Sequence, residues 1–150
     1  MLFFVDFKGN GLLEFPENVS DKLPKLKELY LHGNLLNLLP DSIGLFSNLK
    51  ILELPYNQLL GLPETIGQLK SLNTLDLSYN LLEILPETIG DLCNLTTLVV
   101  VKNELKSLPK SLKKLKALQS LHLSGNQLTS IPQGVLMVNE RMKYDEFIFK

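Results

Sequence analysis

One unit of about 23 residues, repeated along the chain, constrains the fold more than any other feature of the sequence. Apolar residues stand eight, five and three positions before a recurring asparagine and two positions after it, and a proline stands six positions after it. A unit this short cannot bury its own apolar side, so neighbouring repeats must stack and share one core. The asparagines recur at steps of 24, 23, 23, 23 and 23 residues and are Asn10, Asn34, Asn57, Asn80, Asn103 and Asn126.

The first half of each repeat predicts a short strand. Leucines alternate with other residues, as at Leu75 and Leu77, so both leucines point to one side and the residues between them point to the other. Stacking then places the strands side by side in a parallel sheet above the core. The asparagine stands where the chain leaves the strand, and its amide is expected to satisfy backbone groups that the turn leaves unpaired.

The second half of each repeat predicts a short helix on the return path. Pro63 followed by Glu64 favours a helix start with proline at the first helical position and an acid behind it. We expect such helices to span about two turns. Gly67 has counterparts in Gly44 and Gly90, and no phosphate-binding glycine pattern appears, so these glycines are interpreted as allowing close packing between repeats.

The pattern L-x-x-L-x-L-x-x-N-x-L resembles the leucine-rich repeat. Six matches cover about residues 2 to 135, and the tail L-P-x-x-I-G-x-L at residues 62–69 is similar to the 23-residue class of intracellular proteins such as the Ras-binding and Scribble-like signalling scaffolds. The resemblance implies an α/β fold: a leucine-rich-repeat solenoid, or horseshoe, with a parallel sheet on its concave face and short helices on its convex face. We expect residues 1–135 to form the array of six repeats and residues 136–150 to form a C-terminal capping segment, closed by Met142, Phe147 or Phe149.

Composition narrows the class of protein. Leucine supplies 37 of the 150 residues, and a 45% hydrophobic, 21% charged chain with a net charge of -1 is neither a disordered tail nor a globally basic nucleic-acid binder. No apolar run approaches the roughly 18 residues that a membrane-spanning helix needs. Cys93 is the single cysteine, which excludes a disulfide framework and favours a reducing, cytoplasmic compartment. We interpret Cys93 as a half-buried, inert residue.

Catalytic chemistry is not expected, because the side chains that could perform it do not converge. His32 and His122 are assigned to the same strand position four repeats apart, about 19 Å at about 4.8 Å per strand, so they cannot share a metal ion. Asp76 lies two strands, about 10 Å, from His122 and is too far away to orient its imidazole. The sequence therefore predicts no catalytic residue, no cofactor and no metal site.

Charge is divided along the chain. Residues 1–101 hold 6 lysines against 12 acidic residues, a net charge of -6, whereas residues 102–150 hold 9 basic against 4 acidic residues, a net charge of +5. Two interpretations of the basic part stay open: a solvated convex face, or a contact with an acidic partner or an anionic membrane. The lysines concerned are Lys106, Lys110, Lys113, Lys114 and Lys116.

Binding by proteins that resemble this one generally uses the concave face. Acids on adjacent strands, tyrosines beside them and an apolar margin resemble a protein-binding patch, although ordinary solvated strand residues would give the same pattern. Pro55 is unusual there: either the ladder has ended before it or the third repeat is distorted. The candidate partner-binding residues are Glu28, Tyr30, His32, Glu53, Tyr56, Asp76, Tyr79, Val99, Val101 and His122.

These observations predict a non-catalytic module that binds a protein partner, one presenting basic residues, through its concave sheet face. The alternative is a substrate-recognition or scaffold fragment of a larger enzyme system, such as a ubiquitin ligase, a phosphatase complex or a bacterial effector. Phe3 and Phe4 leave no room for an N-terminal cap, so self-association through that end is also expected. Nucleic-acid binding and integral membrane insertion are not expected.

Overall fold

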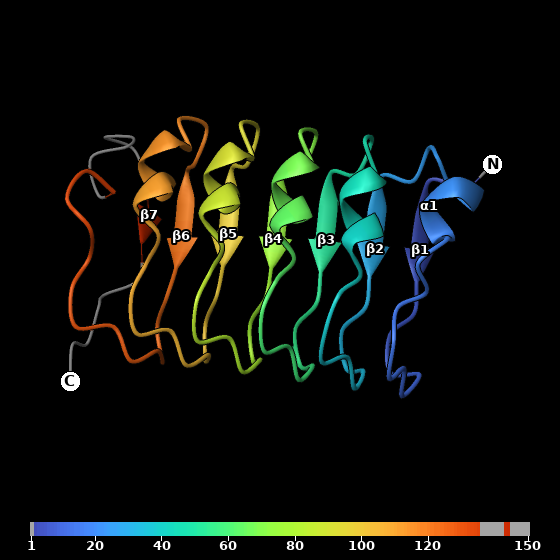
Figure 1. Ribbon diagram of the computed structural model, residues 1–150, viewed down its shortest axis with the longest axis horizontal. Coiled ribbons are helices and arrows are strands. Elements are labelled where there is room, and N and C mark those ends of the chain that lie inside the picture. The colour runs from blue at the N-terminus through green and yellow to red at the C-terminus, as the bar shows by residue number, and fades with distance from the viewer. Residues whose placement is uncertain (1, 136–142, 145–150) are drawn as a thin grey trace.

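The computed structural model describes residues 2–135 and 143–144. Its strands form one sheet in which spatial order follows sequence order and every described pair is parallel (Figure 1). Each repeat thus lies between the repeats that precede and follow it in the chain, as a solenoid requires. The strands are β1 (Phe4–Asp6), β2 (Glu28–Tyr30), β3 (Ile51–Glu53), β4 (Thr74–Asp76), β5 (Thr97–Val99), β6 (Ser120–His122) and β7 (Lys143–Tyr144).

Short helices cover one face of this sheet (Figure 1). They are α1 (Val19–Lys22) and four 3₁₀ helices, η1 (Asp41–Leu45), η2 (Glu64–Gln68), η3 (Glu87–Asp91) and η4 (Lys110–Lys114). The expected solenoid, with a parallel sheet on one side and short helices on the other, is confirmed.

The prolines lie one residue earlier than expected. Pro63 precedes η2 in an extended conformation, with φ -68° and ψ 149°, and its carbonyl accepts a hydrogen bond of 3.0 Å from Ile66 N–H. The prediction of proline at the first helical position is therefore wrong by one residue. In a 3₁₀ helix each N–H bonds the carbonyl three residues earlier. The first such carbonyl belongs to Pro63, which therefore caps η2 and precedes its first helical residue.

Leucines fill the space between the sheet and the helices. Leu75 pairs in register with Leu52 on one side and Leu98 on the other, and all three are fully buried. Leu77, the second leucine of the alternation, is also fully buried. The period-two pattern thus describes one continuous apolar layer beneath the sheet.

The asparagine amides satisfy backbone groups at the turns, as expected, and they also tie each repeat to the one before it. Asn57 donates from Nδ2 to the carbonyl of Leu54 in its own repeat and to that of Leu31 in the preceding repeat, each at 3.0 Å. Its Oδ1 accepts from Leu36 N–H at 3.1 Å. Asn57 is buried, so these bonds satisfy backbone groups that water does not reach.

Pro55 causes no distortion. β3 ends two residues before it, and the carbonyl of Leu31 on the neighbouring repeat already accepts the side-chain amides of Asn34 and Asn57 at 2.8 and 3.0 Å. Tyr56 N–H still bonds the carbonyl of Ser78 at 3.0 Å. Of the two interpretations of Pro55, the end of the ladder is the one that the structure supports.

The helix glycines allow repeats to approach closely, which can be tested. A β-carbon on Gly67 would lie 2.5 Å from the carbonyl oxygen of Thr88 in the next repeat. Gly67→Ala is therefore expected to lower the free energy of unfolding by about 1–3 kcal/mol in urea denaturation. Gly61→Ala is the control, because a β-carbon there meets nothing within 4 Å. Equal effects of the two substitutions would contradict the packing role.

Both ends of the array differ from its middle. Leu2, Phe3 and Phe4 are 57%, 48% and 58% exposed, and self-association through this end stays a prediction. The expected capping segment, with Met142, Phe147 and Phe149, lies outside the described residues except for β7. In the part of the chain that the structure describes, no helix is long and apolar enough to cross a membrane.

Candidate interaction surface

The face of the sheet opposite the helices, here called the open sheet face, is the face that the sequence predicts to be concave. Each strand there contributes two outward side chains flanking a buried central residue, as the burial of β2 to β6 shows. The pairing of the strands aligns these side chains in two rows. The row formed by the last residue of each strand is called the central row. It consists of Asp6, Tyr30, Glu53, Asp76, Val99 and His122.

The register aligns Glu53 with Asp76 as direct neighbours in the central row, whereas Glu28 pairs with Ile51 in the other row. It corrects the prediction for the histidines. His122 aligns with Val99 in the central row, while His32 follows the end of β2. The two histidines therefore do not occupy the same strand position, contrary to the prediction, and β3, β4 and β5 separate them.

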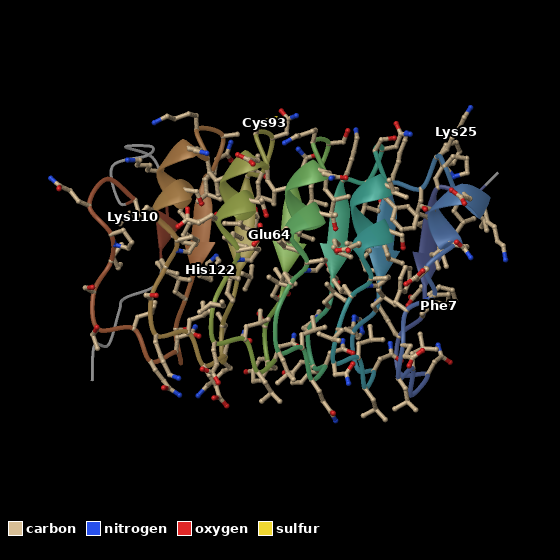
Figure 2. All side chains as sticks on the ribbon, viewed as in Figure 1. Phe7, Lys25, Glu64, Cys93, Lys110 and His122 are labelled. Atoms are coloured by element: carbon tan, nitrogen blue, oxygen red, sulfur yellow. The ribbon has the colours of Figure 1, made fainter. Side chains whose placement is uncertain are left out.

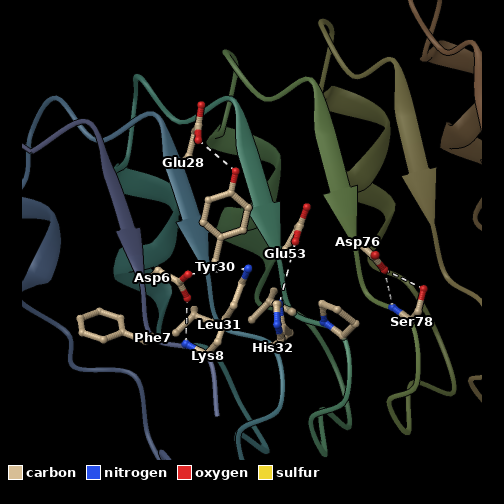
Figure 3. Close-up of polar contacts among 12 residues, drawn as sticks. Asp6, Phe7, Lys8, Glu28, Tyr30, Leu31, His32, Glu53, Asp76 and Ser78 are labelled. Atoms are coloured by element: carbon tan, nitrogen blue, oxygen red, sulfur yellow. Dashed lines mark hydrogen bonds and ion pairs between the residues drawn. The ribbon is translucent and has the colours of Figure 1, made fainter. Parts of the chain in front are cut away.

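The first acidic group surrounds Tyr30 (Figure 3). The Tyr30 hydroxyl donates to Glu28 Oε2 at 2.9 Å, and the Lys8 ammonium lies 5.0 Å from the centre of its ring. Lys8 also pairs with Asp6 at 3.6 Å. Burial, and then the hydrogen bond to Glu28, raises the pKa of the Tyr30 hydroxyl, which therefore remains a neutral donor.

The two neighbouring carboxylates, Glu53 and Asp76, have different partners (Figure 3). Glu53 Oε2 lies 4.0 Å from Nδ1 of His32. Asp76 Oδ1 accepts from the backbone N–H of Ser78 at 2.9 Å and from its hydroxyl at 2.6 Å. Asp76 thus helps to fix the turn that follows its strand, whereas Glu53 makes no backbone bond of this kind among the described contacts.

Tyr56 and Tyr79 lie in the turns after the strands. Their rings stack on each other, with centres 4.3 Å apart and planes inclined by 12°, and 58% and 43% of their surfaces are exposed. A hydrogen bond with Tyr79 is the main cause that raises the pKa of the Tyr56 hydroxyl, and the charge of Asp76 adds to it. The predicted cluster of three tyrosines is therefore divided: Tyr30 lies on the sheet, and the stacked pair lies below it.

Exposed leucines in the turns after the strands were not predicted from the sequence. Leu35, Leu60 and Leu81 are 43%, 59% and 42% exposed, although they stand next to the buried leucine that follows each asparagine. We call these leucines, with Tyr56 and Tyr79, the turn ledge. A comparison between repeats would have revealed them, because the positions of Leu81 and Leu60 hold Glu104 and Lys106 in the fifth repeat.

Val99, Val101 and His122 complete the predicted set. All three are half-buried, so the valines form a narrow apolar margin beside the acids.

Cys93, expected to be half-buried, is instead exposed. Among the described residues, no group of three or more histidine, cysteine, aspartate or glutamate side chains is placed to hold a metal ion.

Two of the clustered lysines have partners within the chain. Lys106 lies 2.7 Å from Glu83 and Lys114 lies 3.4 Å from Asp91, both acids belonging to the preceding repeat. The hydrogen bond and charge of Lys106 hold the pKa of the Glu83 carboxyl below its ordinary value. These contacts favour the interpretation of solvated surface residues for both lysines, with Lys114 in η4 on the helical face and Lys106 in the turn before it.

Comparison with known proteins gives the following matches. A family model described as a leucine-rich repeat region matches residues 35–131. A leucine-rich-repeat protein of Leptospira interrogans is 36% identical over 89% of this chain and 33% of its own, with a TM-score of 0.82. The ectodomain of the plant membrane receptor kinase GASSHO1/SCHENGEN3 from Arabidopsis thaliana, in complex with Casparian strip integrity factor 2, is 33% identical over 77% of this chain and 14% of its own, with a TM-score of 0.70. This chain thus spans a third or less of either matched chain.

Proposed function

This chain belongs to the leucine-rich-repeat family, whose fold is generally a protein–protein interaction module, and on that premise we propose that it binds a protein partner through its open sheet face without catalysis. The partner presents lysine or arginine side chains to the acids of the central row. The module acts as a scaffold, or as the recognition part of a larger enzyme system, and both roles use the same face.

The observation that supports this proposal is the alignment of Glu53 with Asp76 on adjacent strands. Both side chains are half-buried on a surface that the core does not need, and residues 1–101 carry a net charge of -6. Carboxylates with part of their surface in water retain the capacity to pair with a cation that approaches from outside. Such complementarity speeds association and discriminates against acidic partners.

The test is charge reversal, Glu53→Lys with Asp76→Lys. A partner is first recovered with the intact chain, and its dissociation constant is then measured by calorimetry at several salt concentrations. We expect about a tenfold weaker association, because each reversal removes one attraction and adds one repulsion. The affinity of the intact chain should also fall as salt rises.

The matched control is Asp41→Lys with Glu64→Lys. These exposed acids begin η1 and η2 on the helical face, so the control changes the net charge equally on the opposite side. Because Asp76 bonds the Ser78 turn, Glu53→Lys is also measured alone, with thermal unfolding of every variant. Folded variants that bind the partner normally would place the site elsewhere, with the convex lysines as the next candidate.

We assign the module to the cytoplasm. Cys93 is the single cysteine of the chain and is exposed, so no disulfide within the chain stabilises the array. The Arabidopsis match is an ectodomain, which means that related repeats also occur outside cells. Localisation of the tagged full-length protein tests this part of the proposal.

A further inference from the structure

The residue before each asparagine adopts a left-handed backbone conformation. Three of the six repeats place glycine there, Gly9, Gly33 and Gly125, with φ between 64° and 71°. The other three place Tyr56, Tyr79 and Lys102 there, with φ between 54° and 56°. A residue with a β-carbon is strained in this region and glycine is not, so folding alone favours glycine at every one of these positions.

The two tyrosines do not recover this strain by filling the core. Their side chains point outward, and the described ring contact of each is with the other. Strain that the fold does not require points to a role in function. Tyrosine offers a partner a large, rigid contact area together with a hydroxyl group, which explains its frequency among the strongest contacts of protein interfaces.

The turn ledge adds exposed leucines to the tyrosine pair. Leu60 follows Tyr56 and Leu81 follows Tyr79 in the turns after β3 and β4, and Leu35 lies in the turn after β2. Exposed apolar side chains that gather in this way mark interaction sites. Figure 2 shows side chains projecting outward from this lower edge of the molecule.

Charges border the ledge on two sides and define what it accepts. Asp76 lies close enough to Tyr56 to influence its hydroxyl electrostatically, and Asp76 and Glu53 together make the adjoining sheet acidic. Lys102 occupies the tyrosine position in the next repeat. Its side chain lies against Gly125, where an added β-carbon would be 2.6 Å from the Lys102 Cδ. A cationic segment is thus attracted to the sheet side of the ledge and repelled at its C-terminal end.

We propose that the turn ledge binds the apolar side of a basic amphipathic segment of the partner, whose lysine or arginine side chains reach Glu53 and Asp76. This inference rests on the proposed function and adds a second, apolar contact surface below the sheet. A second copy of this chain is a poor occupant, because its own ledge is bordered by the same acids and would be repelled. An acidic segment is repelled for the same reason.

Defined peptides test the proposal without knowledge of the partner. Three labelled peptides of equal length are compared by fluorescence anisotropy: a leucine–lysine amphipathic helix, the same sequence with glutamate for lysine, and the same sequence with serine for leucine. The first has both features of the proposed segment. The second lacks the positive charge, and the third lacks the apolar side.

Two pairs of variants isolate the ledge. Tyr56→Gly with Tyr79→Gly removes the rings and relieves the backbone strain, whereas Lys102→Gly relieves the same strain outside the ledge. Leu60→Ser changes a leucine that is 59% exposed on the ledge, and Leu45→Ser changes one that is 60% exposed at the end of η1. Thermal unfolding is recorded for all four variants.

The leucine–lysine peptide is expected to bind the intact chain. The double tyrosine substitution should raise its dissociation constant about tenfold, which is typical for the loss of an interface anchor. Leu60→Ser should also weaken binding of this peptide, and Leu45→Ser should leave the affinity unchanged. Lys102→Gly removes the repelling charge together with the backbone strain, so it should not weaken binding. The double tyrosine variant should melt at the same temperature as the intact chain or higher. A lower melting temperature, an unchanged affinity, or equal binding of the leucine–glutamate peptide would overturn the proposal.

The serine–lysine peptide separates this inference from the proposed function. Suppose that Glu53→Lys with Asp76→Lys weakens the binding of both lysine peptides while the double tyrosine substitution weakens the binding of neither. That result overturns the proposed role of the turn ledge and supports the proposed function. If the charge reversal affects neither peptide, the proposed partner chemistry of the open sheet face is overturned, whatever the tyrosine variant does.

Discussion

Leu77→Ala is expected to lower the free energy of unfolding by about 2–5 kcal/mol. Leu77 is fully buried between repeats, and its backbone is fixed on both sides. Its N–H bonds the carbonyl of Val99 at 2.8 Å, and its carbonyl accepts the amides of Asn80 and Asn103 at 3.0 and 2.9 Å. The surroundings therefore cannot collapse into the space that the shorter side chain leaves, and the cavity persists.

Urea denaturation monitored by circular dichroism measures this loss. Leu2→Ala is the control, because Leu2 is 57% exposed at the edge of the array and should change stability by about 0.5 kcal/mol or less. Equal losses at the two positions would contradict a core that is shared between stacked repeats.

Asn80→Ala is expected to destabilise the chain by about 1–3 kcal/mol. Asn80 Oδ1 accepts from Leu59 N–H at 3.0 Å, and Nδ2 donates to the carbonyls of Leu54 and Leu77, each also at 3.0 Å. Those two carbonyls keep a second asparagine partner after the substitution, whereas the buried N–H of Leu59 loses its bond. Most of the expected loss therefore comes from this one amide group.

Asn10→Ala provides the comparison for Asn80→Ala. Asn10 occupies the same repeat position but is exposed, and its side-chain amide makes one described bond, to the carbonyl of Lys8 at 3.3 Å. Thermal and urea unfolding should show little change for this variant. A loss as large as that of Asn80→Ala would mean that the asparagine acts through the local turn and not through its bonds to the neighbouring repeat.

The features that the sequence predicted well are those that every repeat shares. The alternation at Leu75 and Leu77 determines which side of the strand is buried, and the asparagine step determines where the chain turns, so sheet, core and ladder follow from spacing alone. The proline position was missed by one residue because spacing does not distinguish a 3₁₀ turn from an α-helical one.

The features that the sequence predicted poorly are those in which single repeats differ. Tyr56 shares its backbone conformation with Gly33, so its strain becomes visible only once φ is known. Leu60 is apolar and stands beside the buried Leu59, yet it points to water, and no pattern of apolar residues records that direction. The different partners of Glu53 and Asp76 depend on side-chain rotamers, which the shared strand position does not determine.

The asparagine hydrogen bonds between neighbouring repeats also affect the order in which the repeats unfold. Each buried asparagine reaches its own repeat and the adjacent one, so the coupling passes from neighbour to neighbour as in a row of linked units. In such a row the outermost units fray first, and amide protons exchange last in the middle. Glu53, Asp76 and the stacked tyrosines belong to repeats that asparagine bonds join to a neighbour on each side, so the surface assigned to binding opens later than a repeat that has one neighbour.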